Sequence, residues 1–128
     1  MFEIGIVEEF EAAHALGPEF GPASRLHGHT YRVEVLIRGE RLDASGTLYP
    51  LDQLQQATRA LLANLHYQHL DTLPAFQSMN STVEHVCLYL HRELSASLDR
   101  TRLHSLKVTV WESPRIFAAR DGPLSGEI

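Results

Sequence analysis

The sequence of 128 residues contains a single cysteine, Cys87. One cysteine cannot close an intrachain disulfide, and it cannot provide the cysteine-rich ligand set of many structural zinc sites. No apolar run approaches the length of a membrane span. The N-terminal residues also lack the basic and apolar regions of a signal peptide. These absences predict a cytoplasmic protein that does not bind a membrane.

The sequence also lacks an excess of basic residues. Its 11 lysines and arginines are outnumbered by 16 aspartates and glutamates, which gives a net charge of −5. Without a general positive field, nucleic acid is not a favoured partner. The hydrophobic content of 44% and the charged content of 21% are typical of a soluble globular protein. We expect one domain over residues 1–128, which is long enough to bury a substantial core.

Histidine is plentiful, and three of the eight histidines form a pattern. His27 and His29 are separated by one residue, so on an extended segment both imidazoles point to the same face. His14 ends another extended segment, whose even-numbered residues are mostly apolar. If the two segments pair, the three imidazoles converge. Three neutral nitrogens around an open fourth position are typical of a catalytic zinc site.

The remaining histidines and the cysteine are expected to be ordinary residues. An isolated histidine usually lies in the core or on the surface, and five histidines are isolated: His66, His69, His85, His91 and His104. Cys87 falls within an apolar helical stripe, which favours a buried thiol over a nucleophile.

Hydrophobic periodicity predicts four strands and two helices. The strands are expected at residues 2–16, 29–39, 106–110 and 116–120, and the helices at residues 50–65 and 81–98. The order β-β-α-α-β-β predicts an α+β fold, in which an antiparallel four-stranded sheet carries two consecutive helices on one face. Ser81 and Glu84 have the spacing of a capping box at the start of the second helix. Between the helices, residues 66–80 form a loop long enough to suspect a function.

Several stretches resemble one enzyme family. Residues 10–14 read Phe-Glu-Ala-Ala-His and residues 26–31 read Leu-His-Gly-His-Thr-Tyr, which is similar to the zinc signature of the 6-pyruvoyltetrahydropterin synthase and 6-carboxytetrahydropterin synthase family. Residues 81–86 resemble the family's Thr-x-Glu helix start. Residues 108–112, Val-Thr-Val-Trp-Glu, resemble its late strand, which ends in a glutamate that anchors the pterin. The resemblance runs from about residue 2 to residue 120, in the family's order.

The resemblance carries expectations about fold, cofactor and assembly. It implies the tunnelling fold, in which subunits associate sheet to sheet, and a homo-oligomer that is commonly a hexamer built as a dimer of trimers. It also implies Zn²⁺ held by His14, His27 and His29, and a small-molecule pterin as substrate.

Glu112 is the expected ligand of the pterin ring. It is in phase with Leu106, Val108 and Val110, so a carboxylate ends a run of inward-facing apolar residues, which is costly unless the carboxylate is paired or meets a polar ligand. By phase alone, a solvent-exposed glutamate or an ion pair with Arg115 is equally consistent. The resemblance favours the ligand role, because the 2-amino group and ring N–H of a pterin are two parallel donors.

The start of the second helix supplies two further candidates. The family contacts the pterin ring with backbone groups and a threonine from this region, so the resemblance favours a ligand contact for Thr82. Glu84 is also a candidate for substrate binding, but its role as the reciprocal half of the capping box is preferred.

The sequence departs from the family at the proton-transfer residues. Most members have a cysteine four residues before the first histidine of the pair, where this chain has Ala23. The adjacent Ser24 is expected to be a loop residue, because a serine hydroxyl needs an activating base. The family's aspartate and histidine after the first helix are His66 and Tyr67 here. His66, Tyr67 and His69 are therefore the candidate catalytic residues.

The resemblance implies a zinc-dependent lyase with altered proton-transfer residues, acting on 7,8-dihydroneopterin triphosphate or a close relative. The bond cleaved could be carbon–oxygen or carbon–carbon, and a retro-aldol cleavage to a hydroxymethyl pterin remains open. Two alternatives remain: a pterin- or purine-binding module that keeps the zinc without turnover, and a protein whose zinc is only structural.

Overall fold

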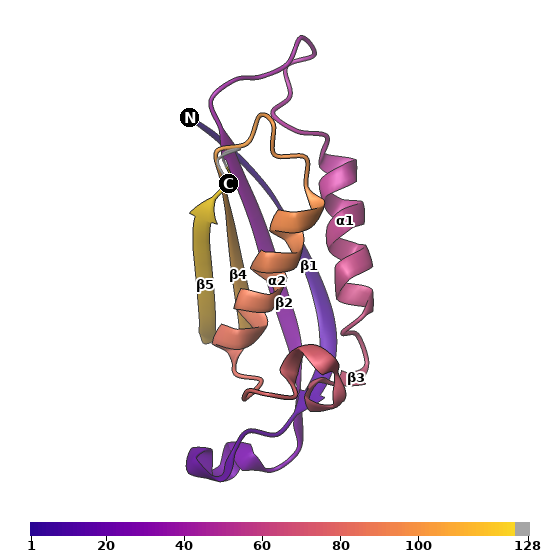
Figure 1. The fold of residues 1–128 in the computed structure, drawn as a ribbon, viewed down its shortest axis with the longest axis vertical. Helices are drawn as coiled ribbons and strands as arrows, with labels where there is room; N and C mark the ends of the chain where they lie inside the picture. The colour runs from indigo at the N-terminus through magenta and orange to yellow at the C-terminus, as the bar shows by residue number, and fades with distance from the viewer. Residues whose placement is uncertain (125–128) are drawn as a thin grey trace.

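A twisted sheet carries two helices on one face in the computed structural model, which describes residues 1–124 (Figure 1). The strands are β1 (Phe2–His14), β2 (His27–Gly39), β3 (Gln68–His69), β4 (Ser105–Ser113) and β5 (Ile116–Pro123). The helices are α1 (Leu51–Ala63) and α2 (Val83–Ser97). The strand order is β3-β1-β2-β4-β5, and every pairing is antiparallel except the short parallel pairing of β3 with β1. The expected α+β class, with consecutive helices on one face, is confirmed.

The sheet has five strands in place of the predicted four. The additional strand, β3, contains two residues and lies in the segment predicted to be a loop. Two residues are too few to show an alternating pattern, so sequence periodicity cannot detect such a strand. The strand bounds also differ slightly, because β1 ends at His14 and β2 begins at His27.

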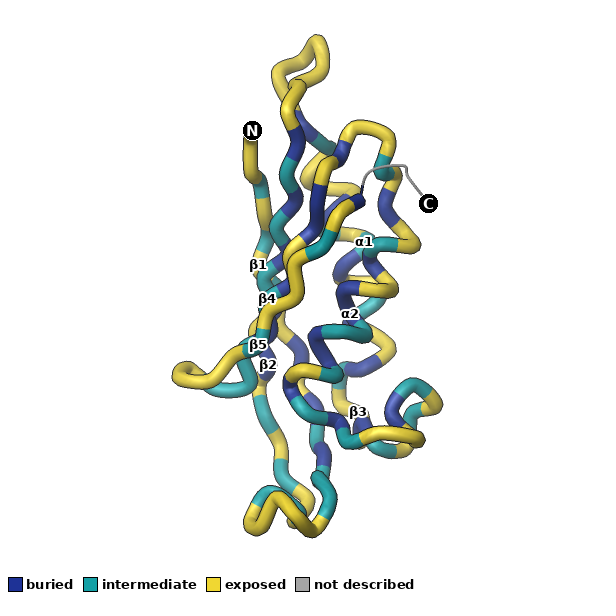
Figure 2. The backbone as a smooth tube through the Cα atoms, turned by 60° about the vertical axis from the view of Figure 1, so that its left-hand side comes forward, coloured by how far each residue is buried: buried dark blue, intermediate teal, exposed yellow. Residues whose placement is uncertain are grey.

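The core lies between the sheet and the helices. Tyr31, Val33, Val35 and Ile37 are fully buried on the inner face of β2. They face the apolar stripes of the helices, which include Leu54 and Leu62 of α1 and Val86, Leu90 and Leu94 of α2. Figure 2 shows the buried segments of strands and helices turned toward each other, with exposed residues on the outside. The alternation of β2 therefore fixes which side chains reach the layer beneath the helices.

Cys87 belongs to this core, as expected from its position in the apolar stripe. Its thiol donates a hydrogen bond to the Val108 carbonyl at 3.2 Å, and burial raises the pKa of Cys87 to about 11. A thiol held in its neutral form is a poor nucleophile.

The start of α2 differs from the predicted capping box. Thr82 is the N-cap, and its hydroxyl oxygen accepts the backbone N–H of His85 at 3.2 Å. Ser81 is buried, and its hydroxyl donates to the Asp71 carboxylate at 2.7 Å, while Glu84 is exposed. A charged acceptor makes the stronger hydrogen bond, so Ser81 turns away from the helix and the capping box of Ser81 with Glu84 is wrong.

Neither helix combines the length and hydrophobicity that a membrane crossing would require.

Candidate metal and ligand site

Three imidazoles meet where β1 ends and β2 begins. The antiparallel register places His14 opposite His27 and Ala12 opposite His29, so all three rings lie on the inner face of the sheet. One ligand nitrogen from each ring lies within 4.8 Å of the others. This spacing allows the three nitrogens to hold one metal ion, as the sequence pattern predicts.

The hydrogen bonds of two rings identify the nitrogens that remain free. His14 Nδ1 lies 2.8 Å from the Ser81 carbonyl oxygen, and His27 Nδ1 lies 2.7 Å from the Arg25 carbonyl oxygen. A carbonyl oxygen can only accept, so each Nδ1 carries the proton and each Nε2 carries a lone pair. Histidine ligands of metals commonly donate their other ring N–H to a backbone carbonyl in this way.

His14 Nε2 itself argues for a bound group. His14 is 1% exposed, and its Nε2 is a buried atom without a hydrogen-bond partner in the described structure. A buried polar nitrogen without a partner is costly. The donor set of three imidazole nitrogens therefore fits a metal ion.

Burial keeps two of these rings in the form that a metal requires. Desolvation lowers the pKa of His14, although the hydrogen bond to Ser81 favours its protonated form. Desolvation also lowers the pKa of His29, against the attraction of Glu112. Both rings are therefore neutral at pH 7, and only a neutral imidazole nitrogen can bind a metal.

Glu112 lies beside the imidazole cluster, on the same inner face of the sheet. Its Oε2 is 3.9 Å from His29 Nε2, and the Glu112 side chain is 21% exposed. Among the described residues, the ion pairs of the chain do not join Glu112 to Arg115. A carboxylate at the end of an apolar strand is thus close to the cluster and still accessible to a ligand.

The other two predicted substrate residues lie at the start of α2. Thr82 follows Ser81, which contacts His14, so Thr82 is one residue from the cluster; its hydroxyl oxygen is engaged in the helix cap. Glu84 is exposed on the first turn of the helix.

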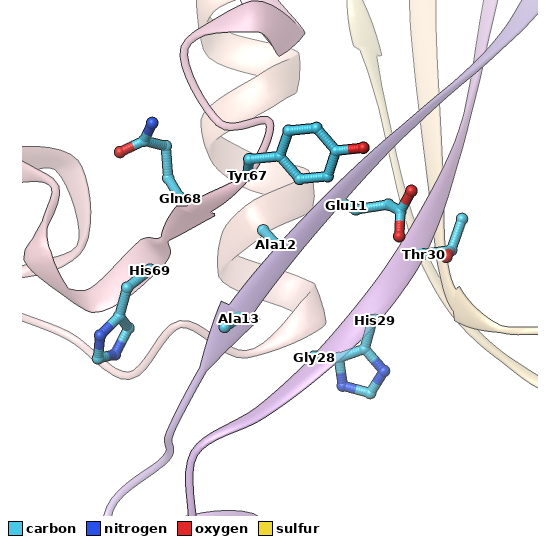
Figure 3. A pocket seen from close by; sticks show the side chains of 9 residues that line it. All are labelled: Glu11, Ala12, Ala13, Gly28, His29, Thr30, Tyr67, Gln68 and His69. Carbon is cyan, nitrogen blue, oxygen red and sulfur yellow. The ribbon is translucent and has the colours of Figure 1, made fainter.

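The three candidate catalytic residues lie on the opposite side of β1 from β2. His66 Nδ1 accepts the Glu11 N–H at 3.0 Å, and the Tyr67 N–H donates to the Glu11 carbonyl at 2.6 Å. Tyr67 has a φ of 60°, and 75% of it is exposed. His69 belongs to β3, which pairs with β1. Figure 3 shows β1 between His69 and His29, so these candidates do not join the imidazole cluster within one chain.

A surface cavity of about 450 Å³ lies over this edge of the sheet. Its lining includes Glu11, His29, Thr30, Tyr67 and His69, and Figure 3 shows the Tyr67 ring extending over β1 toward Glu11. A carboxylate, a phenol and an imidazole thus line one cavity next to a residue of the cluster, with the His69 ring pointing away from Tyr67 and Glu11 (Figure 3). A left-handed conformation at a bulky residue such as Tyr67 is uncommon, and such residues are often found at functional sites.

The segment that would contain the family's cysteine forms a short 3-10 helix, η1 (Pro18–Ser24), where the sequence predicts a loop. Leu16 N–H donates to the Ala23 carbonyl at 3.0 Å, and the Ser24 hydroxyl donates to the Gly21 carbonyl at 2.6 Å. Ser24 is the last residue of this helix, so the prediction that it lies in a loop is wrong; its hydroxyl is bonded to a backbone carbonyl and not to an activating base.

Sequence reasoning missed Asp71, which accepts hydrogen bonds from the Ala15 N–H and the Ser81 hydroxyl next to His14. No local pattern connects residue 71 with residue 15, because 56 positions separate them.

Comparisons with known proteins identify the family and support the fold. A sequence model of the family described as 6-pyruvoyl tetrahydropterin synthase matches residues 3–123. A putative 6-pyruvoyl tetrahydrobiopterin synthase of Caenorhabditis elegans is 31% identical over 122 residues, which cover 85% of this chain and 86% of that protein. A 6-carboxy-5,6,7,8-tetrahydropterin synthase of Synechocystis sp. is 31% identical over 120 residues, covering 90% and 92%.

The structural comparison supports the same assignment. The solved structure of the Caenorhabditis elegans 6-pyruvoyl tetrahydropterin synthase superposes with a TM-score of 0.87 and 28% identity, and the match covers 94% of this chain and 95% of that one. The predicted tunnelling fold is therefore confirmed. With the family match spanning nearly all of the described residues, the chain belongs to the 6-pyruvoyl tetrahydropterin synthase family.

Proposed function

We propose that the protein is a zinc-dependent lyase that acts on the side chain of 7,8-dihydroneopterin triphosphate or a close relative. The observation that supports this function most strongly is the cluster of His14, His27 and His29 with the Glu112 carboxylate beside it. Three neutral nitrogens leave the fourth position of a tetrahedral metal free for a substrate oxygen. The family membership supports a tetrahydropterin synthase-like lyase in general.

We assign metal binding and pterin binding to different residues of the chain. Zinc, when bound by the three imidazoles, would act as a Lewis acid toward a substrate hydroxyl or carbonyl. Glu112 would accept the 2-amino group and ring N–H of the pterin, so the ring is oriented with its side chain toward the histidines. Thr82 and Glu84 are proposed to contact the substrate from the start of α2, with Thr82 one residue from the group that holds His14.

The candidate proton-transfer residues require a second copy of the chain. His66, Tyr67 and His69 lie across β1 from the imidazole cluster, so they are better placed to reach the site of a neighbouring subunit than their own. A homo-oligomer, expected from the family to be a dimer of trimers, would bring them there.

The sheet has free edges for such an assembly. β3 pairs only with Ala12 and Ala13 of β1, and no other strand in residues 1–124 pairs along that edge. An open strand edge favours pairing with another chain. Exposed apolar side chains accompany the edges, including Phe2, Val7, Ile116 and Phe117.

An activity assay tests the function. Zinc-loaded protein is incubated with dihydroneopterin triphosphate, and triphosphate release and pterin products are followed. Turnover supports the lyase. Tight binding without product supports the second candidate, a pterin-binding module, which is favoured by the alanine at position 23 in place of the cysteine. A protein that neither binds nor converts the pterin would contradict both candidate functions.

Glu112→Gln should weaken pterin binding. The substitution replaces one acceptor oxygen with a donor that opposes the ring N–H groups, and loss of a charge-assisted hydrogen bond costs roughly 1.5–3 kcal/mol. This corresponds to a rise in Kd of about tenfold to more than a hundredfold, measurable by calorimetry.

The matched control is Glu3→Gln, which changes a glutamate at the opposite end of β1 that pairs with Arg38 at 3.1 Å. Zinc content is measured for both proteins, because Glu112 also lies near His29. An unchanged pterin affinity in a folded, zinc-loaded Glu112→Gln protein would rule out the anchoring role.

A further inference from the structure

The Asp71 carboxylate is connected through Ser81 to His14, the most buried imidazole of the cluster. Asp71 Oδ1 accepts the Ser81 hydroxyl at 2.7 Å, and its Oδ2 accepts the Ala15 N–H at 2.8 Å. The same Oδ2 lies 3.2 Å from His69 Nε2. Asp71 thus connects the segment that follows β1 with the residue pair that precedes α2.

Ser81 connects this carboxylate to the His14 ring. The Ser81 hydroxyl has one hydrogen, which it donates to Asp71, so its lone pairs face His14 Nδ1 at 3.2 Å. The Ser81 carbonyl oxygen accepts from the same Nδ1 at 2.8 Å. His14 Nδ1–H is therefore shared between two oxygens of a single residue, and Asp71 determines how one of them is oriented.

The contact between Ser81 and His14 is well protected from water. Ser81 is 0% exposed and His14 is 1% exposed, so hydrogen bonds between them are not weakened by competing solvent. Although its partial burial acts in the opposite direction, the hydrogen bonds from Ser81, Ala15 and His69 lower the pKa of Asp71. The group behind Ser81 is accordingly a carboxylate anion at neutral pH.

We propose that Asp71 is a positioning residue for the metal site: through the Ser81 hydroxyl it fixes the plane of the His14 ring, so that Nε2 is presented to the metal. The proposal rests on the proposed zinc site. It extends that site to an acidic residue outside the histidine signature, because residues that orient a ligating histidine commonly affect metal affinity as well as geometry.

Zinc affinity, measured by competition with a chromogenic chelator, tests the proposal. Asp71→Asn and Ser81→Ala should each weaken zinc binding by roughly 10–100-fold. Because Asp71 acts through Ser81, the double variant should lose less than the product of the two single losses. Two losses that multiply would show that Asp71 does not act through Ser81 and would overturn the proposal.

A matched control separates positioning from general loop stability. Asp43 also accepts three hydrogen bonds within a loop, from the Ser45 N–H, the Thr47 N–H and the Thr47 hydroxyl. It belongs to the connection between β2 and α1, at the opposite end of β2 from His27. Asp43→Asn should leave zinc affinity unchanged. If Asp71→Asn does not fold, Ser81→Ala provides the measurement, because it leaves the bond between Asp71 and Ala15 in place.

Nuclear magnetic resonance of the metal-free protein gives a second, independent result. Long-range proton–nitrogen spectra should show His14 protonated at Nδ1 in the wild type and in both variants, because the Ser81 carbonyl oxygen that accepts from Nδ1 is a backbone atom. The His14 nitrogen signals should nevertheless shift or broaden in Ser81→Ala and Asp71→Asn, because the ring is no longer held in one plane. If the wild type binds no zinc but the variants show this change in the His14 signals, the proposed metal site is contradicted and the positioning role is supported. Normal zinc binding with no change of affinity or of the His14 signals in either variant would overturn the positioning role alone.

Discussion

Zinc should be lost from His27→Ala and His29→Ala proteins while the fold is kept. Both side chains lie at the start of β2, outside the fully buried core, so truncation removes a ligand without opening a large cavity. The binding free energy of Zn²⁺ at a structural site is roughly 10–16 kcal/mol. Divided among three or four ligands, this gives about 3–4 kcal/mol for each. We therefore expect a loss of affinity of about a hundredfold to a thousandfold for each variant.

Metal content after gel filtration and chelator titration measure this effect, with unfolding curves as a check on the fold. His104→Ala is the control, because His104 is exposed and immediately precedes β4, away from the cluster. Full stoichiometric zinc in both cluster variants would refute the assignment of the ligands. The experiment separates the metal site from the pterin site, since it needs no substrate.

The unmodified protein should be a slow synthase of the standard type. The family resemblance predicts that Ala23, His66 and Tyr67 stand where most members have a cysteine, an aspartate and a histidine. A positioned acid–base group is typically worth roughly 10²–10⁴ in rate, so its absence should leave a deficit of that size in the formation of a 6-pyruvoyl or 6-carboxy product. A slower reaction or cleavage of another bond is compatible with this deficit.

Restoring the three residues should raise synthase activity. Aspartate at position 66 can still accept the Glu11 N–H that His66 Nδ1 accepts at 3.0 Å. Histidine at position 67 suits the observed φ of 60° better than tyrosine does. The structure therefore predicts that Ala23→Cys, His66→Asp and Tyr67→His can be combined without unfolding the chain.

The decisive measurement compares product formation by the triple variant with that by the double variant His66→Asp/Tyr67→His, which lacks the thiol. The triple variant should exceed the double variant and the wild type in product formation at saturating substrate. A wild type that already works at the rate of the standard enzymes would show that the three positions are wrongly aligned, or that His69 and Ser24 carry the proton transfer.

The sequence by itself determined the features that depend on strand periodicity. Two histidines separated by one residue must share a face of an extended segment, and the inward phase of Glu112 follows from the same alternation. The α+β class and both helices follow from local apolar spacing, since a helix shows its 3.6-residue period within a few turns. These features are set by neighbouring residues, so a linear pattern contains them.

Only the tertiary structure decided which distant groups meet those residues. Ser81 reaches His14 across 67 positions of sequence, and β3 pairs with β1 through only two residues. The position of His66 beside Glu11, 55 residues away, likewise depends on where the chain returns after α1. Such contacts leave no periodic trace, because each involves one or two residues whose partners are fixed by the packing of helices on the sheet. The Ser81 hydroxyl shows the physical reason. The local sequence predicts that it caps the N-terminus of α2, but in the folded chain it donates to the Asp71 carboxylate, which is the stronger acceptor.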